Sequence, residues 1–239
     1  MPQPTGRSHS SAGIPWYWQK INLFEGTEPG VREAFVKSAE QLQFRRGQHV
    51  FRADDLATRV FFLESGMIRI YHLSANGCVI IFWFCSPGDL FGAGGISGSL
   101  DQSVYGQAVE PSTVFMIPRS RFEDLLIAHP QLAINVIRLM GGRLRLACDA
   151  MVDKVSLCTE SRLARLLLRL AENWGRPSGE GVELKVRISH QELANMIGTC
   201  RQTVNMILHE FLKEGIIEFR GRIIYIAAPQ RLKAQTDIR

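Results

Sequence analysis

The apolar positions between about residues 40 and 118 form short runs rather than helical stripes. Examples are the runs at 60–63 and 79–84, and turn residues such as Asn76-Gly77 separate them. Short apolar runs with turn residues about every 8–20 positions are typical of a sandwich or barrel, and Asn-Gly favours a type I′ hairpin. We therefore predict an all-β unit, a small β-roll or jelly roll.

One long helix is predicted next, over about residues 131–156. Its apolar side chains step by three or four, close to the 3.5-residue repeat of a coiled coil. We expect them to join two copies of the chain as a parallel homodimer; a helix that packs only on its own β unit is the alternative. The predicted seam consists of Ile137, Met140, Leu144, Ala147, Met151, Val155 and Cys158.

Residues 189–208 have the spacing of a helix-turn-helix, whose second helix enters a DNA major groove. Ser189 can cap the first helix while the side chain of Glu192 reaches back to it. Gly198 can take the left-handed conformation that the turn needs, and Val204 provides a core anchor. An ordinary helical hairpin with a polar outer face is the alternative.

The flanking segments favour the DNA-binding interpretation. A helix is predicted at 159–171, a loop at 173–181 and a strand at 182–188, and β-rich runs flank the later turn Arg220-Gly221-Arg222. This hairpin with a basic tip predicts a wing, which would lie along phosphates. The C-terminal third from residue 161 holds 13 Lys and Arg against 8 Asp and Glu, which accounts for the net charge of +5. Localised positive charge indicates a polyanionic partner.

The second helix, from about Thr199 or Cys200, carries polar side chains opposite its apolar face. Arg201 can pair bidentately with guanine, and Gln202 can pair with adenine. Phosphates would instead meet a helix N-terminus and the wing tip. The predicted DNA contacts are Ser189, His190, Gln191, Thr199, Cys200, Arg201, Gln202, Thr203, Asn205 and Arg222.

Composition narrows the class of protein. The chain has 239 residues, 46% of them hydrophobic, which suits one or two domains with a sizeable core. No apolar run reaches the roughly 20 residues of a membrane span, and the N-terminus lacks the apolar core of a secretory leader, so we expect a cytoplasmic protein. Its five cysteines and six histidines show no paired ligand spacing, so no metal site is predicted. No nucleophile elbow, phosphate loop or paired acidic motif is present, so we do not expect an enzyme.

Three motifs carry a resemblance over nearly the whole chain. They are Phe61-Phe-Leu-Glu-Ser-Gly-Met-Ile-Arg-Ile70, Pro87-Gly-Asp-Leu-Phe-Gly92 and Gly198-Thr-Cys-Arg-Gln-Thr-Val204. With this order of elements the sequence resembles the family of the cAMP receptor protein and the fumarate-nitrate reduction regulator. The resemblance implies an α+β homodimer that binds a palindromic operator in double-stranded DNA, contacts RNA polymerase, and is switched by a small molecule between β-roll and dimer helix.

The implied domains are a flexible tail at 1–15, a β-roll sensor domain at 16–130, a dimerisation helix at 131–158, and a winged helix-turn-helix at 159–239. One alternative is a redox- or haem-responsive regulator of the same fold. Another is a ligand-binding module that controls a partner protein, against which the basic wing argues.

The cyclic-nucleotide binders of this family use a glutamate for the ribose and an arginine for the phosphate, and those positions here look like Ala93 and Gln102. A phosphate buried without a cationic partner keeps a large desolvation cost. We therefore expect no cAMP binding, and an apolar organic effector is the leading hypothesis. The predicted pocket comprises Trp83, Gly92, Ala93, Gly94, Gln102, Ser103, Ala147 and Cys148.

Other cofactors have less support from the residues. No cysteine precedes Cys78, which excludes the N-terminal cysteine cluster of the iron–sulfur members. The haem ligands of the carbon-monoxide-sensing members would fall in the segment Gly92-Ala-Gly94, which has none, and haem bound through His72 or His129 has no positive support. No cofactor is predicted. The aromatic residues of the β unit are also compatible with a plain core and no effector.

Overall fold

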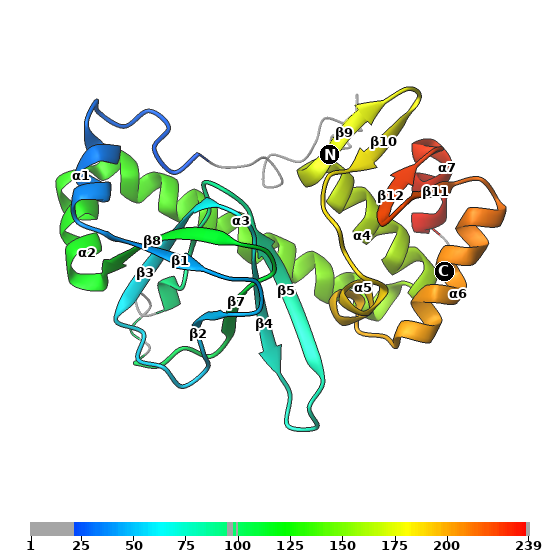
Figure 1. The fold of residues 1–239 in the computed structure, drawn as a ribbon, viewed down its shortest axis with the longest axis horizontal. Coiled ribbons are helices and arrows are strands. Elements are labelled where there is room, and N and C mark those ends of the chain that lie inside the picture. The colour runs from blue at the N-terminus through cyan, green and yellow to red at the C-terminus, as the bar shows by residue number, and fades with distance from the viewer. Residues whose placement is uncertain (1–21, 95–97, 99, 238–239) are drawn as a thin grey trace, which may run out of the picture.

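The structure is a computed structural model that describes residues 22–94, 98 and 100–237. The predicted tail at 1–15 lies outside these residues. Two antiparallel four-stranded sheets, in the orders β1-β8-β3-β6 and β2-β7-β4-β5, form the N-terminal unit (Figure 1). Their strands are β1 (Glu40–Phe44), β2 (His49–Phe51), β3 (Arg59–Ser65), β4 (Ile68–Leu73), β5 (Val79–Cys85), β6 (Leu90–Phe91), β7 (Tyr105–Ala108) and β8 (Ser112–Pro118).

Strand β3 is buried on both of its faces, which explains its unbroken apolar run. Phe61 and Leu63 point into the core between the two sheets, whereas Val60 and Phe62 pack beneath the helices on the other side. Phe61 is in register with Phe91 on β6. The predicted all-β unit at 40–118 is confirmed.

The turn between β4 and β5 differs from the predicted type I′ hairpin. A type I′ turn needs a positive φ at both central residues. Gly77 has a φ of 81°, but Asn76 does not have a positive φ. Ser74 closes this longer loop instead, because its hydroxyl accepts a hydrogen bond from the amide of Cys78 at 3.0 Å. The type I′ prediction is therefore wrong, since a longer loop needs only one left-handed residue.

Three helices accompany the β unit. The short helix α1 (Val31–Lys37), which we did not predict, packs with α2 (Arg119–Ala128) and the first turns of α3 (Pro130–Ser156). The buried rings of Phe35 and Phe122 meet at 6.1 Å between centroids. The long helix packs on the β unit from its first turns to Arg143, whose guanidinium donates a hydrogen bond to the Leu90 carbonyl, and its C-terminal end reaches the DNA-binding part (Figure 1).

The C-terminal part combines helices with a third four-stranded sheet, in the order β11-β12-β10-β9. Strand β9 lies inside the segment 173–181 that we predicted as a loop, and β10 is shorter than the predicted strand at 182–188. Both differences from the prediction arise because a tight turn folds this segment back on itself, so that β9 and β10 pair as a hairpin. The elements are α4 (Thr159–Trp174), β9 (Gly175–Ser178), β10 (Gly181–Leu184), α5 (His190–Ile197), α6 (Arg201–Lys213), β11 (Ile217–Arg220), β12 (Ile223–Ile226), α7 (Pro229–Ala234) and the 3₁₀ turn Gln235–Asp237.

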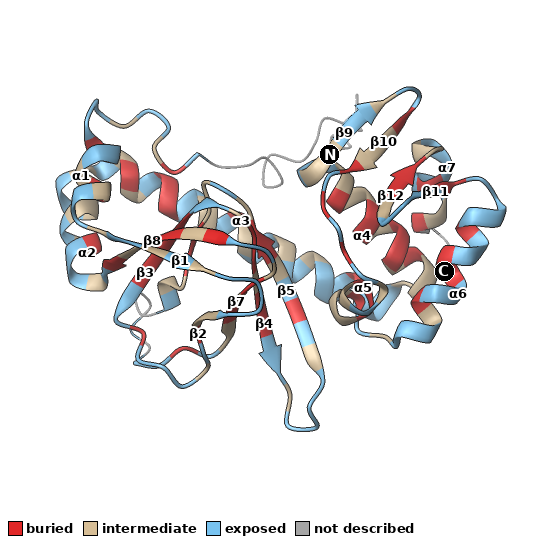
Figure 2. Cartoon of the chain, viewed as in Figure 1, coloured by how far each residue is buried: buried red, intermediate tan, exposed pale blue. Residues whose placement is uncertain are grey.

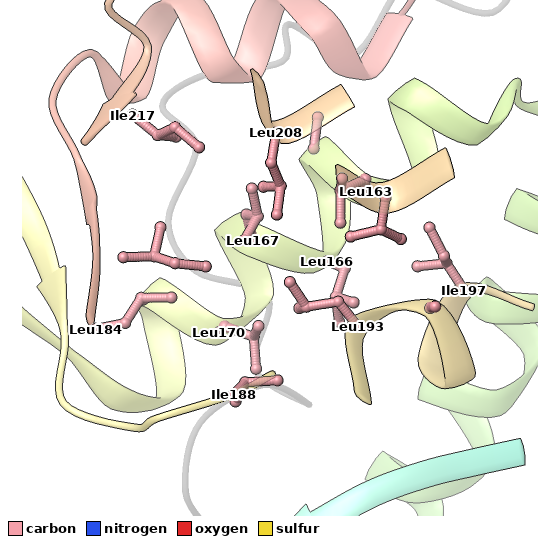
Figure 3. Close-up of a cluster of buried hydrophobic side chains, with 14 of the residues drawn as sticks. Leu163, Leu166, Leu167, Leu170, Leu184, Ile188, Leu193, Ile197, Leu208 and Ile217 are labelled. Atoms are coloured by element: carbon pink, nitrogen blue, oxygen red, sulfur yellow. The ribbon is translucent and has the colours of Figure 1, made fainter. Parts of the chain in front are cut away.

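Aliphatic side chains form the core of this C-terminal part. Figure 3 shows leucines of α4 converging with residues from α5, α6 and the small sheet. Leu163, Leu167 and Leu193 are fully buried there. Figure 2 shows that burial is concentrated along α4 and in the β unit, whereas much of α6 is exposed. In the part of the chain that the structure describes, no helix is both long enough and apolar enough to span a bilayer.

Candidate DNA interface and effector pocket

Helix α5 begins as its sequence predicts. The Ser189 hydroxyl accepts a hydrogen bond from the Glu192 amide at 3.2 Å, and the Glu192 carboxylate accepts one from the Ser189 amide at 2.8 Å. This reciprocal capping box satisfies two amide donors at the helix start. The helix ends at Gly198, whose φ of 70° is left-handed. A residue with a side chain would be strained there, so glycine fixes the turn before α6.

Helix α6 separates an apolar and a polar face. Val204 and Phe211 are fully buried on one face. Arg201, Gln202 and Asn205 are exposed on the other. The helix therefore presents a row of hydrogen-bonding side chains to solvent, with nothing of the described chain covering them.

Cys200 occupies the N-cap position of α6 and is exposed. Its sulfur lies 3.1 Å from the Thr203 hydroxyl, and hydrogen bonds from the Thr203 side chain and amide lower the pKa of this thiol. Thr199 and Thr203 are partly buried beside it. The start of α6 thus combines amide donors, a hydroxyl and a thiol whose pKa is lowered.

The wing is a hairpin of β11 and β12, as predicted, with Gly221 in the left-handed region at its tip. Its two arginines differ. The guanidinium of Arg220 lies 3.5 Å from the ring centroid of Tyr225 and pairs with Glu218 at 3.6 Å, so Arg220 is held by contacts within the wing itself. Arg222 is exposed at the tip and is the arginine placed to meet a phosphate.

The wing and the start of α5 lie next to each other. The rings of His190 and Phe219 are 5.9 Å apart between centroids. Ser189 and Gln191 are exposed beside them. The structure thus places all ten predicted DNA contacts outside the core and brings the α5 start close to the wing, as a shared phosphate-binding surface would require.

The predicted effector pocket is only partly assembled. The amide of Gln102, a residue 5% exposed, donates a hydrogen bond to the Gly92 carbonyl at 3.2 Å. A Cβ on Gly92 would lie 2.5 Å from the Phe61 ring, and a Cβ on Gly94 would lie 3.7 Å from the Gln102 carboxamide oxygen. The Phe61 ring stacks on the Phe51 ring at 5.4 Å. Gln102 and these rings therefore fill the space beside Gly92.

A cavity of about 330 Å³ remains next to Gln102, and its lining includes Phe51, Asp55, Arg59 and Phe61. It is bounded by both charges and rings. Its lining is thus of mixed polarity rather than purely apolar.

The other predicted pocket residues lie elsewhere. Trp83 is half-buried on β5, and the guanidinium of Arg143 from α3 lies 5.2 Å from its ring centroid. Ala93 packs with the cluster beneath the helices, and Ser103 is exposed. Ala147 and Cys148 are exposed on α3. Of the eight predicted residues, only Gln102 lines the cavity of about 330 Å³ described above.

The exposed apolar seam of α3 differs in part from the predicted one. Met140 packs with the β-unit cluster, and Cys158 lies outside the helix as the N-cap of α4. The predicted seam is wrong at Cys158, because α3 ends at Ser156, and Met140 is partly buried against the β unit. Ala147 is exposed but lies one position before the heptad row. The exposed positions with heptad spacing are Ile134, Ile137, Gly141, Leu144, Cys148, Met151 and Val155.

A buried carboxylate joins α3 to the DNA-binding part. The side chain of Asp153, near the end of α3, is 7% exposed and pairs with Arg165 at 2.5 Å and with Arg169 at 2.6 Å, both on α4. Two charged partners offset the cost of burying the carboxylate. The sequence shows an aspartate in a polar stretch of helix, so reasoning from the sequence missed this hinge contact.

Two protein-family models match the chain. Residues 41–129 match the cyclic nucleotide-binding domain, and residues 161–235 match the Crp-like helix-turn-helix domain. Together these segments make up well over half of the chain, in the order that the fold shows. The chain belongs to the CRP/FNR family of transcription regulators. Members of this family bind DNA, carry an effector-binding domain and are not enzymes.

The similarity to known CRP/FNR regulators extends over most of each chain. The chain is 24% identical over 213 residues to the CRP-like cAMP-activated global transcriptional regulator of Mycobacterium tuberculosis, covering 89% of this chain and 95% of that one. It is 28% identical over 182 residues to the fumarate and nitrate reduction regulatory protein of Yersinia pestis, covering 76% and 72%.

Solved structures share the fold. FixK2 from Bradyrhizobium japonicum superposes with a TM-score of 0.74 at 24% identity, over 84% of this chain and 98% of that one. A CooA mutant from Carboxydothermus hydrogenoformans gives 0.75 at 24% identity, over 84% and 89%. The predicted α+β architecture of β-roll, long helix and winged helix-turn-helix is confirmed.

The structure of this CRP/FNR chain allows its residues to be compared with the needs of two family ligands, an iron–sulfur cluster and a cyclic nucleotide. Among the described residues, no three His, Cys, Asp or Glu side chains group as metal ligands. A cyclic phosphate beside Gly92 would meet the carboxamide of Gln102, which already bonds to the backbone, and no guanidinium at that position. At this position the effector domain therefore offers a neutral carboxamide rather than a cation.

Proposed function

We propose that this protein is a homodimeric regulator that recognises a palindromic operator through α6. The observation that carries the proposal is the free polar face of α6 beside a basic wing tip. Arg201 and Gln202 would read base edges in the major groove, and Asn205 would follow them one turn later. Because its target is chromosomal DNA, such a regulator acts in the cytoplasm. It affects transcription through contact with RNA polymerase.

Phosphate contacts complete the proposed interface. Ser189, His190 and Gln191 lie at the start of α5, where unpaired amides favour an anion. Thr199, Cys200 and Thr203 surround the start of α6, and Arg222 holds the wing on the backbone. These contacts fix the register of the protein on DNA without reading sequence.

The heptad seam of α3 supports the homodimer. Ile137 and Leu144 are 68% and 67% exposed, and an exposed row of such side chains on one helix face marks an interaction surface. A second copy of α3 packed in parallel would bury this row and set the two α6 helices about one DNA turn apart.

The proposed effector is a compound other than cAMP, and an organic molecule with apolar surface fits the residues best. Phe82 is 47% exposed beside Trp83 on β5, and the Trp83 ring lies under Arg143 of the dimer helix. Ala147 and Cys148 lie further along α3, so a second copy would bring the predicted pocket residues closer together. The cavity beside Gln102 is the other candidate position.

Two experiments test the proposal. Selection of bound fragments from genomic DNA, followed by gel shift, should give a two-fold symmetric sequence whose binding weakens with salt and is abolished by specific competitor. Random DNA competing equally well would contradict sequence-specific regulation. Calorimetry with cAMP should give no saturable binding at micromolar concentration, and saturable binding would overturn our exclusion of this ligand.

A further inference from the structure

The outer face of the sheet that contains β4 and β5 is apolar where a solvent-facing surface would be polar. Tyr71, Ile81 and Phe84 are each less than 9% exposed, and they belong to the same buried cluster as Leu193 and Ala194 of α5. Such a face stays buried only where another element covers it. In this chain the covering element is the DNA-binding part, which docks on its own β-roll.

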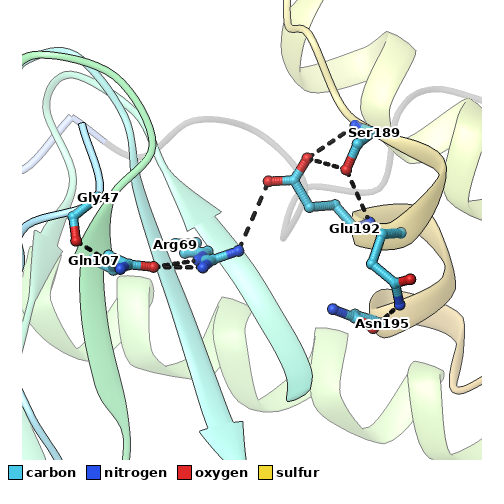
Figure 4. A network of polar contacts seen from close by, with 7 residues as sticks. Gly47, Arg69, Gln107, Ser189, Glu192 and Asn195 are labelled. Carbon is cyan, nitrogen blue, oxygen red and sulfur yellow. Dashed lines mark hydrogen bonds and ion pairs between the residues drawn. The ribbon is translucent and has the colours of Figure 1, made fainter. Parts of the chain in front are cut away.

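A charged contact lies at the edge of this docked surface. Figure 4 shows the guanidinium of Arg69, on β4, reaching the carboxylate of Glu192 on α5. Their N–O distance is 3.9 Å, and the two side chains are 25% and 20% exposed. Glu192 is also the carboxylate of the capping box at Ser189, so the ion pair ends on the first turn of α5.

The β-roll holds Arg69 in a fixed position. Its guanidinium donates two hydrogen bonds to the carboxamide oxygen of Gln107, and the Gln107 amide donates to the Gly47 carbonyl at 2.7 Å (Figure 4). The same guanidinium lies 5.1 Å from the ring centroid of Tyr71. Because these partners restrict the arginine before docking, little rotamer entropy remains to be lost when Glu192 arrives.

Docking through this contact leaves the predicted recognition surface open. Arg201, Gln202 and Asn205 remain exposed, and α6 lies on the side of α5 away from the β-roll (Figure 1). The contact therefore orients the DNA-binding part without covering it. A dimer that reads two half-sites needs a fixed orientation of its DNA-binding parts, because the separation of the two α6 helices must match one DNA turn.

We infer that Arg69, anchored by Gln107, is a positioning residue that sets the spacing of the two recognition helices by holding α5 on the β-roll. The inference rests on the proposed dimeric DNA binding. Loss of the contact would let each DNA-binding part move about the turn between α3 and α4. The protein would then bind a palindromic operator more weakly and would tolerate altered spacing between its half-sites. A single half-site requires no relative orientation and would be unaffected.

The test compares Arg69→Ala and Gln107→Ala with Arg121→Ala. Arg121 pairs with Asp124 at 4.0 Å on the exposed surface of α2 and serves as the matched control. Each full-length variant is titrated on the selected palindrome, on the same palindrome with one or two base pairs inserted at its centre, and on DNA with one half-site scrambled. A partly exposed ion pair contributes up to about fivefold for each protomer, so we expect Arg69→Ala to weaken palindrome binding by roughly 5- to 20-fold.

The titrations separate the inference from its alternatives. We expect the ratio of palindrome to half-site affinity to fall in Arg69→Ala, with a smaller fall in Gln107→Ala, while half-site affinity stays within about twofold of the parent. Tighter palindrome binding would show that docking inhibits DNA binding, and equal weakening on all DNAs would show a general loss of folding. Either result overturns the inference, and so does binding like that of the parent on every DNA. A parent that fails to distinguish the palindrome from half-site DNA would instead count against the proposed function.

Hydrogen exchange in the free protein tests docking without DNA. Amides of Val79–Cys85 and of His190–Ile197 should exchange faster in Arg69→Ala than in the parent and in Arg121→Ala, because the interface opens more often. Unchanged exchange in both segments would show that the ion pair does not hold the interface.

Discussion

Substitution of Asp153 should destabilise the junction between α3 and the DNA-binding part. Its carboxylate pairs with Arg165 and Arg169 across the turn between α3 and α4. Breaking a buried ion pair costs about 3–5 kcal/mol, but Arg165 is 36% exposed, so solvent screens part of the loss. We expect Asp153→Ala to lower the free energy of unfolding by about 2–4 kcal/mol.

Urea denaturation at a fixed protein concentration measures this effect. Asp153→Asn keeps the volume and can still accept hydrogen bonds, so it should lose less than Asp153→Ala. Asp124→Ala is the control, because Asp124 pairs with Arg121 at 4.0 Å and both side chains are about 70% exposed. That change should cost less than about 0.5 kcal/mol. Equal destabilisation by Asp153→Ala and Asp124→Ala would refute the assignment of a structural ion pair to this hinge.

Three further predictions concern the dimer, the wing and the thiols. Leu144→Asp should raise the dimer dissociation constant measured by sedimentation at least about a hundredfold, since the dimer would lose two buried leucines. Ile127→Asp, at an exposed position on α2, should leave this constant unchanged. A stable Leu144→Asp dimer would show that α3 does not form the interface. Arg222→Ala should reduce the salt slope of DNA binding by about one unit for each protomer, and an unchanged slope would place the wing away from phosphate. Iodoacetamide at pH 8 should label Cys200 well before Cys85, because hydrogen bonds from Thr203 lower the pKa of the Cys200 thiol while burial raises the pKa of Cys85 to about 12. Bound operator DNA should protect Cys200 from labelling. Equal labelling of the two thiols in mass spectrometry would contradict this order.

Local patterns predicted much of the fold. The capping box at Ser189, the turn at Gly198 and the wing around Gly221 each depend on a few neighbouring residues, so the sequence alone could indicate them. The β-roll also followed from its short apolar runs. The hairpin of β9 and β10 was missed because its first strand consists of Gly, Arg, Pro and Ser, which have little strand preference.

Contacts between distant segments could not be predicted in this way. Arg69 and Glu192 each fit a plain local role, an outward residue of a strand and a capping carboxylate, and only the fold brings them together. The same holds for Asp153, which the folded hinge buries. Met140 has the spacing of a seam residue, but the β unit covers it, and periodicity does not tell which partner a helix face meets.

The most direct test of sequence-specific recognition by α6 is the effect of Arg201→Ala on two DNAs of equal length, the selected operator and a random sequence. An arginine that reads a guanine edge contributes about 1–3 kcal/mol at its own base pair and little elsewhere. We predict that Arg201→Ala weakens operator binding by that amount for each half-site and leaves random-DNA binding nearly unchanged at the same salt concentration. Equal weakening on both DNAs would contradict the account, because it would make Arg201 a phosphate contact and leave α6 without its principal base-reading residue.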